Sequence, residues 1–246
     1  MKENFLELRK KFTEIRNLGY IKPLRTGSTG IGYTFETLLN KEEDTSCIPD
    51  YKGIEIKTKL GYSKYPLKLF TCIPNPKGEI SAARYILEKY GYIKFDDKQT
   101  LIFSRTVYCN KVIERYGYSF KLRVDYLYKE LVMEAYYQGI FVENVCTWDF
   151  KNLERKLKTK LKYLAVVKAY PYYIDKKEYI KYLKMDTYAL YGFFEFLKLI
   201  ENDCVQVEFY IKKKNYLYED FTFENHGVAF KLEIEYLEQL FRKLPY

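Results

Sequence analysis

Residues 26–59 read TGSTGIGYTFETLLNKEEDTSCIPDYKGIEIKTK, and this stretch is the most informative part of the sequence about the fold. A glycine-rich turn is followed by a helical pattern, an acidic run and a short alternating segment, GIEIKTK. Two carboxylates and an amine lie close together around the start of that segment, namely Asp50, Glu55 and Lys57. This group is either a charged loop that runs into a strand or a metal site.

The spacing of the group allows a shared metal ion. Alternate side chains of a strand face the same way, so Glu55 and Lys57 should project together, and Asp50 is near enough for its carboxylate to bend towards Glu55. Two carboxylates repel unless a cation lies between them, and such a site suits Mg²⁺, with the backbone carbonyl of Ile56 as a further oxygen ligand. The metal can activate water and Lys57 can stabilise negative charge, which is the chemistry of phosphodiester cleavage.

The composition is that of a folded, basic protein. The 246 residues can form one large domain or two modest lobes, and the net charge of +9 favours a polyanionic partner such as nucleic acid. The five cysteines are scattered without a CxxC spacing, which argues against a disulfide framework or a zinc site and for a reducing compartment. The N-terminal segment lacks a signal-peptide core, and no run approaches the roughly 20 apolar residues of a membrane span. We therefore expect a soluble cytoplasmic protein without a membrane partner.

The hydrophobic periodicity predicts a mixed α/β (α+β) fold. Helices are expected at residues 3–18, 31–44, 79–90 and 150–160, and a further helix capped by Asp186 should run to about Ile200. Strands are expected at residues 53–59, 120–128, 164–167, 205–212 and 228–234. The run at 164–167 suits a strand buried on both faces, and the last two strands can pair.

Four segments resemble a known family of nucleases: GSTGIGYTFETLLNKEED (27–44), PDYKGIEIKTK (49–59), LKLFTCIPNPKG (67–78) and ENHGVAFKLEIEYLEQL (224–240). In this order they closely resemble the MvaI/BcnI group of type II restriction endonucleases, relatives of the mismatch-repair nicking enzyme MutH in the PD-(D/E)xK class. The resemblance implies a MutH-like core, with a central mixed sheet flanked by helices, and a DNA-recognition lobe.

The resemblance also assigns the site. Asp50, Glu55 and Lys57 match the catalytic triad, and Glu36 matches an additional acidic residue near the active site of this group. The metal ligands would be Asp50, Glu55 and the backbone of Ile56. The implied cofactor is Mg²⁺, with Mn²⁺ as a possible substitute and Ca²⁺ supporting DNA binding only.

Gly27, Gly30 and Gly32 match the turn that opens the helix bearing the additional acidic residue. Glycine there permits positive φ and close backbone approach, and Gly30 is a candidate for contact with the DNA backbone, with a plain structural turn as the alternative. A nucleotide-binding P-loop is not expected, because the Gly-Lys-Ser/Thr ending is missing.

Base recognition in the family belongs to strands near the C-terminus, where Glu208, Tyr210, His226 and Lys231 align. Strand alternation places Glu208 and Tyr210 on one face, opposite their apolar neighbours. The MvaI-like pattern has arginines where this sequence has Tyr210 and Lys231, and lysine reads guanine less rigidly than arginine. The target sites of the family are therefore not assigned to this chain. His226, the single histidine, either contacts DNA or has a structural role.

The expected organisation is a mainly catalytic lobe at residues 1–110 and a mainly DNA-recognition lobe at 111–246, with some elements of the second returning to the core. The expected function is that of a Mg²⁺-dependent, monomeric type II restriction endonuclease acting on double-stranded DNA. A cognate DNA methyltransferase can belong to the same system without being a bound subunit. The alternatives are a MutH-like strand-nicking repair enzyme and a DNA-binding module with a decayed site, and the intact triad argues against the latter.

Overall fold

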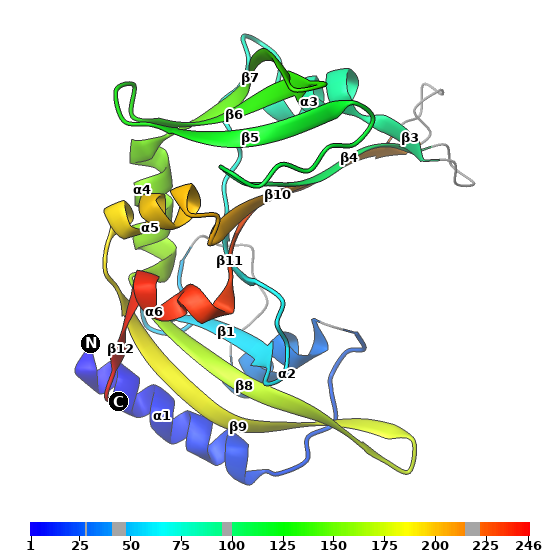
Figure 1. Ribbon diagram of the computed structural model, residues 1–246. Helices are drawn as coiled ribbons and strands as arrows, with labels where there is room; N and C mark the ends of the chain where they lie inside the picture. Colours follow the sequence, from blue (N-terminus) through cyan, green and yellow to red (C-terminus); the bar gives the residue numbers. More distant parts are fainter. Residues whose placement is uncertain (28, 41–47, 95–99, 215–221) are drawn as a thin grey trace. The chain divides into compact units, whose positions relative to one another are not determined.

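A computed structural model describes the chain except residues 28, 41–47, 95–99 and 215–221 and the side chains of 222–226 (Figure 1). Its contacts divide the chain into two compact units. Unit 1 consists of Met1–Tyr65, Leu157–Gly192 and Leu237–Tyr246, and unit 2 of Pro66–Lys156 and Phe193–Tyr236. The chain therefore passes between the units four times.

Unit 1 is built on a mixed four-stranded sheet in the order β1-β8-β9-β12. The strands are β1 (Glu55–Leu60), β8 (Tyr163–Ile174), β9 (Lys177–Leu190) and β12 (Phe241–Leu244). Strand β1 runs parallel to β8, while the β8–β9 and β9–β12 pairs are antiparallel. Its helices are α1 (Lys2–Asn17), α2 (Gly30–Leu38), the short α6 (Leu237–Leu240) and the last turn of α4 (Phe150–Leu161). The one-turn 3-10 helix η1 (Ile234–Tyr236) is the last element of unit 2 before the chain returns to unit 1.

Helix α1 forms because its apolar residues recur at helical spacing and have a sheet to cover. Phe5, Leu8, Phe12 and Ile15 are all buried, and α1 runs alongside β9 (Figure 1). They share a core with α2 and with residues of β1, β8 and β9. The expected run at 164–167 is buried throughout, so this part of β8 is covered on both faces, as predicted.

Unit 2 contains two antiparallel sheets, in the orders β2-β11-β10-β4-β3 and β5-β6-β7. The first is formed by β2 (Leu67–Thr71), β3 (Tyr92–Lys94), β4 (Thr100–Val107), β10 (Val205–Lys214) and β11 (Thr222–Leu232). The second is formed by β5 (Tyr118–Asp125), β6 (Glu130–Tyr137) and β7 (Ile140–Asp149). Helices α3 (Ala82–Tyr90), α5 (Phe193–Glu201) and the start of α4 complete the unit. The predicted pairing of the strands at 205–212 and 228–234 is confirmed by the β10–β11 register.

The predicted start of a helix at Asp186 was wrong. Residues 177–190 form β9, in which Asp186 pairs with Val166 of β8, and α5 begins only at Phe193. Sheet pairing over twelve residues of β8 outweighs the capping signal of one aspartate, because capping is local and contributes only about 1 kcal/mol.

Three other element boundaries differ from those expected. Helix α3 starts after Ser81, whose hydroxyl accepts a hydrogen bond from the Arg84 N–H, so Ile80 lies outside it and is 43% exposed. Strand β5 ends at Asp125, whose carboxylate accepts from the backbone N–H groups of the next turn. Helix α2 ends at Leu38, and residues 41–44 of the expected helix lie outside the described part.

Cys72, Cys109, Cys146 and Cys204 are free thiols, while Cys47 lies outside the described residues. In the described part of the chain, no helix has the length and apolar character needed to cross a membrane.

Candidate active site

A tight turn brings Asp50 back to the start of β1. Tyr51 and Ile54 exchange two backbone hydrogen bonds, and the residues between them, Lys52 and Gly53, have φ of 45° and 85°. Positive φ at both central positions is the geometry of a tight hairpin turn and favours glycine. The chain thus reverses within four residues, so that Asp50 lies beside the first residues of β1.

The Asp50 carboxylate is fixed by the strand that follows. Its Oδ2 accepts a hydrogen bond of 2.9 Å from the backbone N–H of Ile56. The side chain of Ile56 is buried in the core, so its backbone cannot move away from the turn easily. The bend of Asp50 towards β1 that the sequence suggested is therefore held by a specific contact.

Glu55 and Lys57 project together, as strand alternation predicts. Glu55 is 1% exposed, and Lys57 Nζ donates a hydrogen bond of 2.5 Å to its Oε1. Burial raises the pKa of Glu55; the ammonium of Lys57 opposes this rise and the charge of Asp50 adds to it. Two acidic groups in one partly desolvated place favour a cation between them.

A second lysine, Lys160 in the last turn of α4, also belongs to this cluster. Its Nζ lies 3.0 Å from Glu55 Oε2 and 4.0 Å from Asp50 Oδ1, and it donates a 2.9 Å hydrogen bond to the Ile48 carbonyl. Lys160 was not predicted from the sequence, because a lysine near a helix C-terminus is common on solvated surfaces and no local pattern connects it with β1.

One atom of the cluster bears directly on metal binding. Within the described residues, Glu55 Oε2 is buried and accepts no hydrogen bond; its contact with Lys160 is an ion pair only. Outside the gaps in the description, no three Asp, Glu, His or Cys side chains gather into a metal site. A buried carboxylate oxygen beside a second carboxylate fits a hard divalent ion that takes some ligands from two carboxylates and the rest from backbone, water and phosphate.

Glu36 lies on α2, which packs against β1. A Cβ on Gly32 would lie 3.0 Å from the Thr58 hydroxyl and 3.8 Å from Glu36 Oε1. Glycine at position 32 therefore lets α2 approach β1 closely, with Glu36 next to that contact. Thr58 and Lys57 are neighbours in β1, so their side chains project from opposite faces of the strand. The contact of Gly32 with Thr58 therefore lies on the face of β1 opposite to Lys57.

The glycines of the opening turn have different roles. Gly27 has a φ of 84°, whereas Gly30 and Gly32 lie within α2 and do not have positive φ. Gly30 is buried, and a Cβ there would lie 2.2 Å from the Arg25 carbonyl oxygen. This close approach to the chain's own backbone favours the structural alternative for Gly30 over a DNA contact.

The proposed base-reading residues gather on the five-stranded sheet of unit 2. Val207 and Phe209 of β10 are buried, while Glu208 and Tyr210 lie on the opposite face, as expected from alternation. Lys231 of β11 forms an ion pair of 2.6 Å with Glu208. The side chain of His226 lies outside the described part.

This face contains a polar hollow of about 330 Å³. Its lining residues come from neighbouring strands β4 and β10 and are Ser104, Arg105, Thr106, Glu208, Phe209 and Tyr210. Hydroxyl, carboxylate and phenol groups line it together, which is the mixture of donors and acceptors that reading base edges requires.

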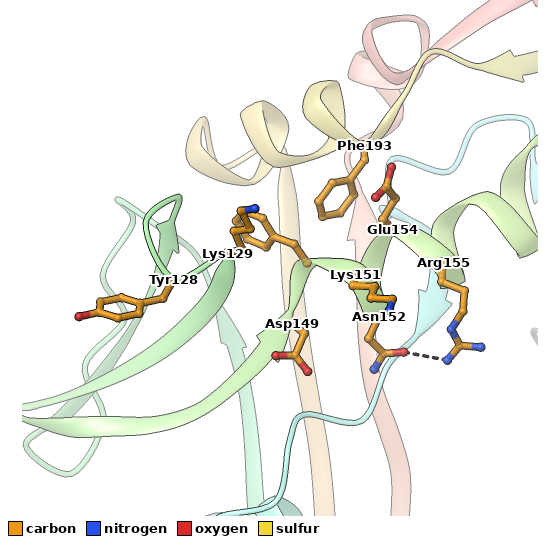
Figure 2. Close-up of a pocket in the computed structure, with 9 residues that line it drawn as sticks. Tyr128, Lys129, Asp149, Lys151, Asn152, Glu154, Arg155 and Phe193 are labelled. Carbon is orange, nitrogen blue, oxygen red and sulfur yellow. Dashed lines mark hydrogen bonds between the residues drawn. The ribbon is translucent and has the colours of Figure 1, made fainter.

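A larger hollow of about 650 Å³ lies at the start of α4 (Figure 2). It is lined by Tyr128, Lys129, Asp149, Phe150, Lys151, Asn152, Glu154, Arg155 and Phe193. Arg155 donates a hydrogen bond of 2.9 Å to the Asn152 side chain, which Figure 2 marks with a dashed line. The size of this hollow does not make it the active site. Its lining includes none of the residues of the carboxylate–lysine cluster, which consists of Asp50, Glu55, Lys57 and Lys160.

A mixed sheet with an aspartate in the preceding turn and Glu-x-Lys on its strand defines a nuclease of the PD-(D/E)xK class. Comparison with known families gives the same assignment: the sequence model of the MvaI/BcnI restriction endonuclease family matches residues 9–241. The chain belongs to this family, and the resemblance noted from its sequence is confirmed. It is therefore a site-specific deoxyribonuclease.

Solved structures of one family member are similar over the whole chain. The complex of restriction endonuclease MvaI with its cognate DNA substrate gives a TM-score of 0.88 at 32% identity, covering 99% of this chain and 98% of that one. MvaI in the absence of DNA gives a TM-score of 0.63 at 31% identity, with the same coverage. A search of curated proteins found no match.

Proposed function

We propose that this chain cleaves double-stranded DNA at a specific sequence with Mg²⁺ held by Asp50, Glu55 and the backbone carbonyl of Ile56. The observation that supports this most strongly is the buried Glu55 Oε2, which lies in a cluster of two carboxylates and accepts no hydrogen bond within the described residues. The metal, when bound, supplies water activation and neutralises charge on the phosphate.

The protein groups have separate tasks in this proposal. The Ile56 N–H holds one oxygen of Asp50, and Lys57 holds one oxygen of Glu55, so that both carboxylates keep a defined orientation. Lys57 is in position to orient the attacking water or to stabilise the extra negative charge of the transition state. Glu36 is proposed as an auxiliary acidic group next to β1.

We assign catalysis to unit 1, which contains the whole cluster, and base recognition to unit 2. Glu208, Tyr210 and Lys231 are the proposed readers there, and a carboxylate beside a lysine can accept from cytosine while the lysine donates to guanine. The proposed enzyme acts as a monomer in the cytoplasm and belongs with a DNA methyltransferase that protects the host site.

Plasmid digestion tests this function. The protein incubated with unmethylated supercoiled plasmid and Mg²⁺ should give linear DNA, and Mn²⁺ should be able to replace Mg²⁺. A chelator should stop cleavage. Replacement of Mg²⁺ by Ca²⁺ should also stop cleavage but should preserve DNA binding. Mapping the fragment ends then gives the target. Open circles that persist would indicate a strand-nicking enzyme, and plasmids without the target site should stay intact.

Lys231→Met tests the assignment of base reading. If Lys231 donates to a base, this change should weaken binding to the target by about 1–3 kcal/mol and relax sequence preference at one position. Binding in Ca²⁺ to the target and to variants with single base changes measures both effects. Lys94→Met, an exposed charge loss on edge strand β3 of the same sheet, is the control. Equal weakening on all sequences would make Lys231 a phosphate contact instead.

A further inference from the structure

The place of Lys160 in the cluster carries an inference that rests on the proposed metal site. Each carboxylate has one oxygen held by the strand itself: Asp50 Oδ2 by the Ile56 N–H and Glu55 Oε1 by Lys57. The other two oxygens, Asp50 Oδ1 and Glu55 Oε2, both lie near Lys160 Nζ, at 4.0 and 3.0 Å. The ammonium therefore lies beside one oxygen of each carboxylate that is proposed to hold the metal.

An ammonium and a divalent ion cannot both stay there easily. Metal–oxygen distances for Mg²⁺ are about 2.0–2.1 Å, so an ion that binds both oxygens would lie within a few ångströms of Lys160 Nζ. The two positive charges would repel in a place where Glu55 is 1% and Asp50 9% exposed, and where solvent screens poorly.

Lys160 also has the means to move aside. It is 22% exposed, its stem of four methylene groups is flexible, and its Nζ already donates to the Ile48 carbonyl outside the carboxylate pair. Lys57 differs, since its contact is with Glu55 Oε1 and not with the Glu55 oxygen that lies beside Lys160.

We propose that the Lys160 ammonium is an internal competitor of the divalent ion: it binds the same two carboxylate oxygens and is displaced when the metal binds. Lys160 is then a positioning residue that keeps the two carboxylates together and lowers the affinity of the protein for metal.

Calorimetric titration of the DNA-free protein with Mn²⁺ tests this competition. Lys160→Met, which keeps the side-chain length and removes the charge, should bind Mn²⁺ about tenfold more tightly than the wild type. Lys160→Arg, which keeps a cation, should show no such gain. Lys158→Met removes a charge two residues away on the exposed part of α4 and should change the affinity less than twofold. Unchanged or weaker Mn²⁺ binding by a folded Lys160→Met protein, as judged by thermal unfolding, overturns the proposal.

Lysine acetylation followed by mass spectrometry separates displacement from a general effect of charge. Saturating Mn²⁺ should increase the acetylation rate of Lys160 several-fold and leave that of Lys158 unchanged, and Asp50→Ala should abolish the increase. An acetylation rate of Lys160 that is unchanged or falls on adding Mn²⁺ contradicts displacement. If the wild type cleaves plasmid with Mg²⁺ while these results fail, only the role of Lys160 is rejected; if it neither binds metal nor cleaves, the proposed function itself is rejected.

Discussion

Asp50→Ala should lower the rate of plasmid cleavage at least about 1000-fold while leaving DNA binding in Ca²⁺ measurable. The change removes one of the two carboxylates that are proposed to hold the metal. It also removes the acceptor of the hydrogen bond from the Ile56 N–H. A divalent ion would then be held by Glu55 and backbone alone, which is too few protein ligands to keep it in a fixed place. Single-turnover cleavage with excess enzyme measures the loss without interference from product release.

Asp149→Ala is the matched control for this change. Asp149 is exposed and lines the larger hollow of unit 2. It is not part of the carboxylate–lysine cluster, whose residues all belong to unit 1. Its removal should change the cleavage rate by no more than a few-fold. An Asp50→Ala enzyme with near wild-type activity, or an equal loss in both variants, would contradict the assignment of Asp50.

Lys57→Met should lower cleavage about 100- to 1000-fold but leave metal binding measurable. Lys57 contacts Glu55 Oε1 and not the buried Oε2, so its loss should affect the reacting groups more than the metal. Cleavage rates together with Mn²⁺ titration of the same preparation separate the two effects. Lys57→Met should therefore lower cleavage more than metal binding, whereas in Asp50→Ala metal binding and cleavage should fall together.

Lys59→Met provides the comparison for Lys57. Lys59 is the next lysine on the same side of β1, and its Nζ donates to the backbone carbonyl of Tyr65. We expect it to retain cleavage within a few-fold. If Lys59→Met lost as much activity as Lys57→Met, the effect would reflect positive charge along the strand and not a specific role of Lys57.

The core of the site was predictable because it depends on local geometry. Glu55 and Lys57 are two residues apart on a strand, and a strand can only place them on one side. Asp50 is brought back by a four-residue turn with glycine at position 53, which a sequence can also suggest. The amphipathic pattern of α1 was equally clear, since a helix of its length has one apolar side to bury.

The remaining features depend on contacts between distant parts of the chain. Lys160 lies more than one hundred residues after Glu55 in the sequence, and it differs from other lysines only in where its helix, α4, ends. Asp186 belongs to β9 because β8 pairs with it, and no signal within its own neighbourhood shows this pairing. The ion pair of Lys231 with Glu208 follows from the register of β10 and β11, which sequence alternation alone does not fix.

The central claim is that Asp50 and Glu55 hold a divalent ion against the DNA backbone. Anomalous scattering from Mn²⁺ in a crystal of this protein with a duplex containing its target tests it most directly. The account predicts a peak within about 2.0–2.4 Å of carboxylate oxygens from both residues. A peak coordinated by other side chains, or no peak at saturating Mn²⁺ with DNA bound, would contradict it.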